Sequence, residues 1–245
     1  MKIVGKDFKG NAVSLNFKVL SDSTKAIERP LPGSSFVKKI DCFKEDTFAT
    51  DSFQIIFHKN CLYHNIELTY FTSGNKYSNF SKLHHIHNSY IPIHNKVSIL
   101  IKPDNLPKDL KNKALIAGLT TKGNIYAVSS EWKDNFLEAK VSSFGTYFIA
   151  IDSLKPVIRS LSIDKYNRVK SGQLKFKITD NLSGVEEYIG YINNKWVLFE
   201  YDQKNNQIEC NLSKEGIKMG KHSLVLWVKD YCGNIASYET SFNFM

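Results

Sequence analysis

The sequence predicts an all-β protein in which a single β-hairpin precedes two β-sandwich domains. Aromatic residues make up 13% of the chain, and Ile, Val and Thr are abundant, which favours strands. Short segments alternate apolar and polar residues and are separated by Gly, Asn and Pro turns. We therefore expect a hairpin at 1–20, a connector at 21–46, a sandwich at 47–152 and a second sandwich at 153–245.

The hairpin is predicted by an internal repeat. Residues Lys6–Ser14 (KDFKGNAVS) recur as Lys229–Ser237 (KDYCGNIAS), and in both copies a Gly-Asn pair turns the chain between two alternating runs. The second copy follows a long stretch of strand-like sequence, whereas the first follows almost none. A lone hairpin cannot bury its apolar face. We therefore expect the chain to be a fragment that begins with the orphan last hairpin of a truncated domain upstream of Met1.

The connector and the first sandwich come next. Ser21–Asp46 contains Pro30, Pro32 and Gly33 and has little periodicity, which is typical of a connector. Leu106–Lys111 can form one helical turn, with Pro107 at a first-turn position. The segments expected to form strands of the first sandwich are Phe53–Phe57, Ile66–Tyr70, Val97–Ile101, Ala114–Leu119, Ile125–Val128 and Tyr147–Ile151.

The second sandwich begins after a boundary at Asp152–Pro156, where a charged stretch ends in proline. Seven or so short strands in about 90 residues are the spacing of an immunoglobulin-like module. Because the hairpin at 1–20 repeats the sequence of this module's last hairpin, we expect it to belong to a truncated immunoglobulin-like domain. The segments expected to form strands are Val157–Ile158, Leu174–Ile178, Tyr188–Ile192, Trp196–Tyr201, Ile208–Leu212 and Leu224–Val228.

Charge and hydropathy exclude several classes of function. The chain has 33 Lys and Arg against 24 Asp and Glu, a net charge of +9 that attracts polyanions in general. The lysines are scattered, and no nucleic-acid-binding motif accompanies them, so we expect no nucleic-acid partner. No run of apolar residues is long enough to span a membrane. The first residues also lack the apolar core of a signal peptide.

The cysteines do not indicate a metal or redox site, because no CxxC spacing is present. We expect free buried thiols, and a pair between Cys210 and Cys232 is the alternative. The four cysteines are Cys42, Cys61, Cys210 and Cys232.

Histidines offer the most specific candidate for chemistry. His85 and His87 are two apart, so on a strand they would share a face and could chelate zinc. A catalytic site needs a third protein ligand, and no His-Glu-x-x-His pattern supplies one. Hydrogen-bonded histidines are therefore expected, and a zinc enzyme is the weakest alternative. The nearby candidates for a third ligand are His58, His64, His84 and His94.

Other candidate groups have structural explanations. Ser183 lacks the Gly-x-Ser-x-Gly pattern of a nucleophile elbow. Glu186 and Glu187 are adjacent on a strand and point to opposite faces, so they cannot act as a glycosidase pair. Asp180 and Asp230 lie in turns, where their side chains are expected to cap backbone amides. Calcium binding by these two aspartates is the alternative.

An aromatic segment around Trp196 could stack on sugar rings. Trp196 and Leu198 share one face of the expected strand, while Val197, Phe199 and Tyr201 share the other. At least one of these series must be core, so we expect packing, with ligand stacking as the alternative. Trp132 and Trp227 are weaker candidates.

Taken together, these motifs resemble the C-terminal region of secreted bacterial lysostaphin-type zinc metallopeptidases, the peptidoglycan endopeptidases of peptidase family M twenty-three. The middle region is similar to the ZU5-like domain of those proteins through Phe48–Phe53, His84–Asn88, Lys113–Ile116 and Ser143–Asp152. It departs from that domain at His58–Cys61. The second sandwich resembles their immunoglobulin-like module through Pro156–Ile158, Asp180–Val185, Asn194–Asp202, Gly220–Leu224 and Asp230–Asn234.

The resemblance implies a zinc site built from an upstream His-x-x-x-Asp and a later His-x-His in a Gly-rich strand. Neither context occurs in this chain, so no catalytic, cofactor-binding or metal residue carries over, and we expect no enzyme activity from the chain itself. Its partners would be a missing upstream catalytic domain and peptidoglycan or other anionic envelope glycans. The location would be the cell envelope, the periplasm or the extracellular space. The alternative is a free-standing surface module that binds anionic glycans.

Overall fold

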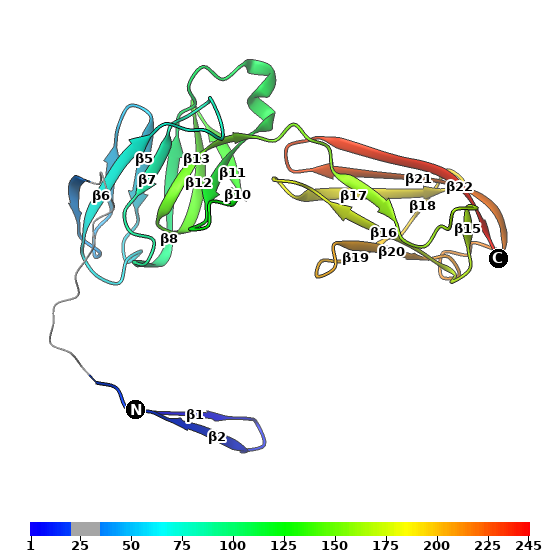
Figure 1. The fold of residues 1–245 in the computed structure, drawn as a ribbon, viewed down its shortest axis with the longest axis horizontal. Coiled ribbons are helices and arrows are strands. Elements are labelled where there is room, and N and C mark those ends of the chain that lie inside the picture. The colour runs from blue at the N-terminus through cyan, green and yellow to red at the C-terminus, as the bar shows by residue number, and fades with distance from the viewer. Residues whose placement is uncertain (21–34) are drawn as a thin grey trace. The chain divides into compact units, whose positions relative to one another are not determined.

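The computed structural model describes residues 1–20 and 35–245 (Figure 1). The described chain is almost entirely β, which confirms the predicted fold class. Its one helical element among these residues is the 3-10 helix η1 (Lys108–Lys113), which overlaps the expected helical turn. No helix of the described residues has the length and apolar character needed to cross a bilayer.

The first element is a hairpin of β1 (Lys2–Lys6) and β2 (Ala12–Asn16), as predicted. It forms a two-stranded sheet of its own, and both strands are exposed along their whole length. The hairpin is a unit separate from the two sandwiches. The upstream domain that we expected to cover the hairpin remains a prediction.

The first sandwich consists of two antiparallel sheets. One sheet has the order β10-β9-β13-β7-β6-β3 and the other β11-β12-β8-β5-β4. Its strands are β3 (Ser35–Ile40), β4 (Asp46–Ala49), β5 (Phe53–Phe57), β6 (Ile66–Ser73), β7 (Leu83–Ile86), β8 (Pro92–Ile101), β9 (Ala114–Leu119), β10 (Ile125–Val128), β11 (Ser130–Lys133), β12 (Phe136–Ser143) and β13 (Gly145–Ile151).

Alternating side chains build the core between these sheets. Along β5, Phe53, Ile55 and Phe57 are buried, and they pack in one cluster with Leu68 of β6 and Ile99 of β8. One part of the expected connector differs from the structure. Strand β3 lies within 21–46 and pairs with β6, and Ile40 at its end is 1% exposed. Residues 21–34 of that stretch lie outside the described residues.

The second sandwich also has two sheets, with the orders β14-β16-β20-β19 and β15-β22-β21-β17-β18. All pairings are antiparallel except that of β15 with β22. Its strands are β14 (Val157–Ser160), β15 (Arg168–Val169), β16 (Gln173–Thr179), β17 (Val185–Ile192), β18 (Lys195–Val197), β19 (Glu200–Asp202), β20 (Gln207–Asn211), β21 (Gly220–Asp230) and β22 (Ile235–Phe244).

The core of the second sandwich follows the predicted alternation. Leu224, Leu226 and Val228 of β21 are buried against Phe176 of β16 and Ile208 of β20. The segment expected to be one strand at Trp196–Tyr201 is instead divided. Strand β18 belongs to one sheet and β19 to the other, so the chain crosses between the layers here.

Candidate functional site

The two sandwiches contact each other at an apolar cluster on the outer face of the six-stranded sheet, which Tyr77 of the first sandwich also covers by stacking on Phe148. Leu115, Ala117, Phe148 and Ala150 point away from the main core and form a separate cluster. The second sandwich contributes Cys232, from the turn between β21 and β22, to this cluster. The junction is therefore an apolar contact between residues far apart in the sequence.

Polar contacts surround this apolar patch. Lys113 Nζ donates to the backbone oxygen of Cys232 at 2.9 Å. Asp152, directly after β13, accepts a hydrogen bond from the backbone N–H of Ser183 at 2.8 Å through Oδ2. The backbone oxygen of Asp152 accepts one from Asn234 Nδ2 at 3.0 Å. Because Asp152 and Asn234 are both buried, these bonds are shielded from competing water.

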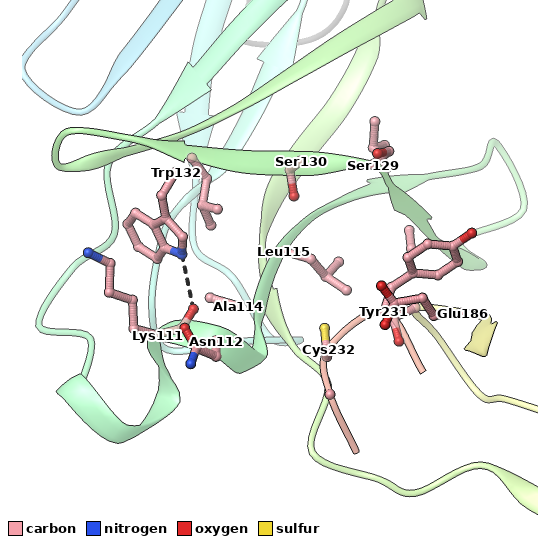
Figure 2. Close-up of a pocket in the computed structure, with 15 residues that line it drawn as sticks. Lys111, Asn112, Ala114, Leu115, Ser129, Ser130, Trp132, Glu186, Tyr231 and Cys232 are labelled. Carbon is pink, nitrogen blue, oxygen red and sulfur yellow. Dashed lines mark hydrogen bonds between the residues drawn. The ribbon is translucent and has the colours of Figure 1, made fainter. Parts of the chain in front are cut away.

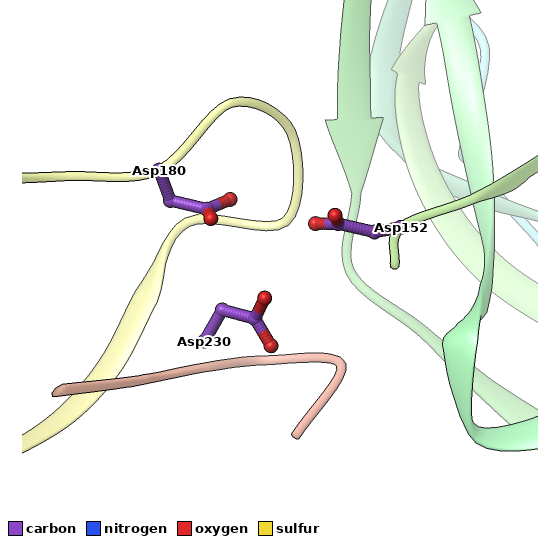
Figure 3. Close-up of side chains that lie close together, drawn as sticks. All are labelled: Asp152, Asp180 and Asp230. Atoms are coloured by element: carbon purple, nitrogen blue, oxygen red, sulfur yellow. The ribbon is translucent and has the colours of Figure 1, made fainter. Parts of the chain in front are cut away.

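Three carboxylates converge beside these bonds. Asp152, Asp180 and Asp230 each offer an oxygen within 4.8 Å of the others, and their side chains turn toward a common space (Figure 3). Asp152 is 1% exposed and Asp230 is fully buried. Asp180 follows β16, and Asp230 ends β21. The fold thus brings together the two aspartates considered as calcium ligands and adds Asp152, which the sequence analysis had placed only at a domain boundary.

Most oxygens of these carboxylates cap turns, as we expected for Asp180 and Asp230. Asp230 Oδ1 accepts from the backbone N–H groups of Cys232 and Asn234 at 2.9 and 2.7 Å. Asp180 Oδ2 accepts from Leu182 and Gly184 in the same way, at 3.0 and 2.9 Å. The capping role therefore accounts for the positions of the two aspartates.

One oxygen of the cluster has no such role. Asp180 Oδ1 is shielded from solvent and has no hydrogen-bond partner. None of the three carboxylates forms an ion pair with a lysine or arginine in the described part of the chain. Carboxylate oxygens are the ligands that Ca²⁺ prefers, and it takes 6–8 of them, so these three side chains would supply part of a shell.

A cleft of about 660 Å³ opens beside the junction (Figure 2). Trp132 of β11 forms one wall, where its Nε1 donates to the backbone oxygen of Lys111 at 3.0 Å. Lys111 Nζ lies 4.8 Å from the centre of the Trp132 ring, a cation–π distance. Tyr231, which is 68% exposed, lies on the side of the second sandwich. The cleft therefore offers two aromatic rings and an ammonium group.

Three of the nucleophilic and acidic side chains that line this cleft, Cys232, Glu186 and Ser130, are engaged or protonated, whereas Ser183 Oγ is buried without a hydrogen-bond partner. Burial raises the pKa of the Cys232 thiol to about 11, and the nearby Asp152 and Asp230 act in the same direction. The thiol is therefore protonated at neutral pH and is a poor nucleophile. Glu186 Oε2 forms an ion pair with Lys229 Nζ at 3.0 Å. Ser130 Oγ accepts a hydrogen bond from the backbone N–H of Ile116 at 3.0 Å.

The expected arrangement of His85 and His87 on one strand face is wrong. Strand β7 ends at Ile86, and His87 has a positive φ of 44°, so its side chain leaves the strand pattern. His85 bonds to Ser73 Oγ at 2.8 Å through Nε2 and to Thr146 Oγ1 at 2.9 Å through Nδ1. Both of its ring nitrogens are thus occupied by structural contacts.

The neighbouring His84 belongs to the core. It is 1% exposed, stacks on Phe53, and its Nδ1 bonds to the Tyr70 hydroxyl at 2.8 Å. Burial lowers the pKa of His84 to about 4. Its Nε2 has no partner. This side chain is neutral at physiological pH and is not open to a ligand from solvent.

Trp196 differs from the expectation that it packs. Val197 and Phe199 are buried, whereas Trp196 is 61% exposed. It lies directly opposite Tyr191 of β17, on the outer face of the five-stranded sheet. Trp227 of β21, opposite Ile189, lies on the same face and is 49% exposed. The alternation in the sequence separated two faces of this segment. The structure shows that the face with Val197 and Phe199 is core and that the face with Trp196 is exposed.

Comparisons with known proteins support part of this description. Residues 38–152 match the family model of the Zu5-like domain, which confirms the ZU5-like character predicted for the middle region. No curated protein matches the sequence. One solved structure with similarity is titled "Ca2+-stabilized adhesin helps an Antarctic bacterium reach out and bind ice". It is 7% identical with a TM-score of 0.24, and the alignment covers 99% of this chain and 80% of that chain.

Proposed function

We propose that this chain is a non-catalytic β-sandwich region of a cell-envelope peptidoglycan metallopeptidase. It would position or anchor a catalytic domain that is not among residues 1–245. The set of motifs shared with the lysostaphin-type peptidases supports this assignment, and the Zu5-like match over residues 38–152 is consistent with it. The zinc endopeptidase activity would belong to the parent protein, in the periplasm or outside the cell.

The observation that carries this proposal is the junction between the two sandwiches. Asp152 accepts hydrogen bonds from the Ser183 N–H and from Asn234 Nδ2, and Lys113 Nζ donates to the Cys232 backbone oxygen. These bonds join the sandwiches around an apolar patch. A junction with buried polar contacts resists bending more than an exposed linker does. Two sandwiches held in this way would act as one arm, which suits a positioning role.

The parent protein tests this proposal directly. An antibody against the second sandwich should detect, in envelope extracts, a species larger than the 28.0 kDa of this chain. Its peptides should include a His-x-x-x-Asp motif and a His-x-His motif. A species of 28.0 kDa alone, or a larger one without those motifs, would overturn the assignment.

A positioning role makes a second, functional prediction for that parent. Asp152→Ala should slow its hydrolysis of intact peptidoglycan while its hydrolysis of a short soluble peptide stays unchanged. Asp104→Ala, at an exposed aspartate of the first sandwich, is the matched control. Equal effects of Asp152→Ala on both substrates would argue against positioning.

A second candidate function is a free-standing surface module for anionic glycans. The exposed rings of Trp196 and Trp227 on one sheet face favour it, because sugar rings stack on flat aromatic surfaces and both tryptophans are available. The net charge of +9 would attract an anionic polymer. Under this alternative the chain would bind glycan without any catalytic partner.

Glycan binding is tested with the purified chain and fractionated cell-wall polysaccharide. Trp196→Ala should abolish saturable binding while thermal unfolding stays unchanged. Tyr90→Ala removes another exposed aromatic side chain, 85% exposed in the first sandwich, and should leave binding intact. Equal binding by both variants would rule out the Trp196 face.

A further inference from the structure

The hairpin at the start of the chain has the same turn as the last hairpin of the second sandwich. Asp7 Oδ1 accepts from the backbone N–H of Asn11 at 2.9 Å, and Asn11 Nδ2 donates to Asp7 Oδ2 at 2.8 Å. Asp230 and Asn234 make the same two bonds, both at 2.7 Å. The backbone N–H of each aspartate donates to the oxygen of its asparagine, at 3.0 and 3.1 Å. The repeated sequence therefore folds into a repeated structure.

The strand register is also the same. Lys6 pairs with Ala12 as Lys229 pairs with Ile235. Further along, Ile3 pairs with Leu15 where, in the second hairpin, Leu226 pairs with Tyr238. Because the register is equal, each residue of β1–β2 has one structural equivalent in β21–β22, and the two hairpins have equivalent faces.

Those equivalents show which face of β1–β2 is built for burial. In the second sandwich, the face with Leu226, Val228 and Phe242 lies in the core. The equivalent face of the first hairpin carries only apolar side chains and one glycine, whereas the opposite face carries mostly Lys, Ser and Asn. The apolar members are Ile3, Val13, Leu15, Phe17 and Val19, which are 54%, 74%, 62%, 39% and 64% exposed.

An edge of the hairpin is open as well. Strand β21 pairs with β22 on one side and with β17 on the other. Its equivalent β1 pairs with β2 alone in the described chain. The hairpin therefore presents both an uncovered apolar face and an unpaired strand edge, each of which favours association with another β-structure.

From this equivalence we infer that β1–β2 docks as the last hairpin of a second immunoglobulin-like sandwich. The occupant of its apolar face is the rest of such a sandwich, a polypeptide with counterparts of β14 to β20. A strand equivalent to β17 pairs with the free edge of β1, and a sheet equivalent to β14-β16-β20-β19 covers Leu15 and its neighbours (Figure 1, β1 and β2 in blue). The chain's own second sandwich displays this same interface, which is why this occupant fits and a lipid or glycan does not.

A photo-cross-linking amino acid identifies what covers the hairpin in the intact protein in its native cells. We place it at Leu15, on the apolar face, and at Ser14, on the opposite face, as the matched control. Neither position is in a core, so neither variant should unfold the sandwiches. The expected result is a cross-link from Leu15 to a peptide of alternating apolar residues from an immunoglobulin-like segment, lost when the probe is at Ser14.

Three outcomes would overturn this inference. They are equal cross-linking from Leu15 and Ser14, a cross-link to residues 35–245 or to a second copy of this chain, and a cross-link to lipid or glycan alone. A second measurement checks the same interface: amide hydrogen exchange in β1 should slow severalfold in the intact protein compared with the isolated chain. Neither readout requires a peptidase, so this inference and the proposed function can fail separately.

Discussion

Lys113 and Cys232 lie 119 residues apart in the sequence and are joined by a 2.9 Å hydrogen bond from the lysine Nζ to the cysteine backbone oxygen. Cys232 Sγ in turn contacts the backbone oxygen of Lys113 at 3.7 Å. These paired contacts connect the end of η1 to the turn between β21 and β22. They define the junction on which the first prediction depends.

Asp152→Ala should uncouple the two sandwiches. It removes the acceptor for the Ser183 N–H and leaves that donor at the junction without a partner, which costs about 1–3 kcal/mol. Calorimetry of the variant should show two separate unfolding transitions, whereas the unsubstituted 245-residue chain should show one. Asp104→Ala is the control, and a single transition in the Asp152 variant would contradict the prediction.

Asp180→Asn should stabilise the chain in the presence of a chelator. It keeps the shape of the turn cap and removes one of three negative charges within 4.8 Å of one another. Like charges at this range repel by roughly 1–4 kcal/mol per pair, depending on the local dielectric constant. Thermal unfolding in EDTA should therefore shift to a higher temperature.

The same variant distinguishes turn capping from the calcium alternative. With millimolar Ca²⁺, a bound cation would reverse the effect, because the amide would replace a charged ligand. If the carboxylates act as caps alone, Ca²⁺ leaves the melting temperature of both proteins unchanged. A fall in the melting temperature of Asp180→Asn in EDTA would contradict the repulsion argument.

Acid should weaken the first sandwich through His84. The pKa of this buried histidine is lowered to about 4 from its ordinary 6.5. Between these values the unfolded chain binds a proton that the folded chain does not. Stability is therefore lost as pH falls from 6.5 to 4, by up to about 3 kcal/mol.

Urea unfolding from pH 7 to pH 4 measures this loss. In His84→Phe the pH-dependent loss should shrink, because the aromatic ring keeps its stacking on Phe53 but cannot be protonated. His94→Phe, at an exposed histidine, is the control. If the free energy of unfolding of His84→Phe depends on pH as strongly as that of the unsubstituted chain, protonation of His84 is not the cause of the acid sensitivity.

Gly190→Ala should destabilise the second sandwich by about 1–3 kcal/mol, as overpacking does. An added Cβ at this position of β17 would overlap the ring of Phe199, which is buried and cannot move aside. Gly118→Ala should cost less, because the overlapping ring there belongs to Tyr126, which is 39% exposed on an edge strand. Equal destabilisation by the two substitutions in chemical denaturation would contradict this reasoning.

Local patterns predicted much of this fold. Alternation gave many of the core strands of both sandwiches, and the Gly-Asn turns gave both hairpins. Strand β12 was not predicted, although its Leu137, Ala139 and Val141 are buried. Strand β3 was missed because its sequence, SFVKKI, ends its apolar run at two lysines, and its register shifts between Phe36 and Lys38. The bulge breaks the period of two on which a strand prediction depends.

The candidate site could be predicted only in pieces. Asp152, Asp180 and Asp230 each had a local signal, as a boundary residue or a turn cap. Their convergence depends on how two domains dock, and no periodicity in the sequence reports it. The prediction that His87 shares a strand face with His85 was wrong for a local reason, because the positive φ of His87 takes it out of the strand.

The contacts around Asp152 also bear on the peptide that connects the sandwiches. Residues 153–155 are exposed, and Leu154 is 62% exposed, so an endoprotease can reach this stretch. The bonds from Lys113 to Cys232 and from Asn234 to Asp152 join the two sandwiches directly, independently of this stretch. A single cut at Leu154 should therefore yield two fragments that separate in denaturant but migrate together on a native gel.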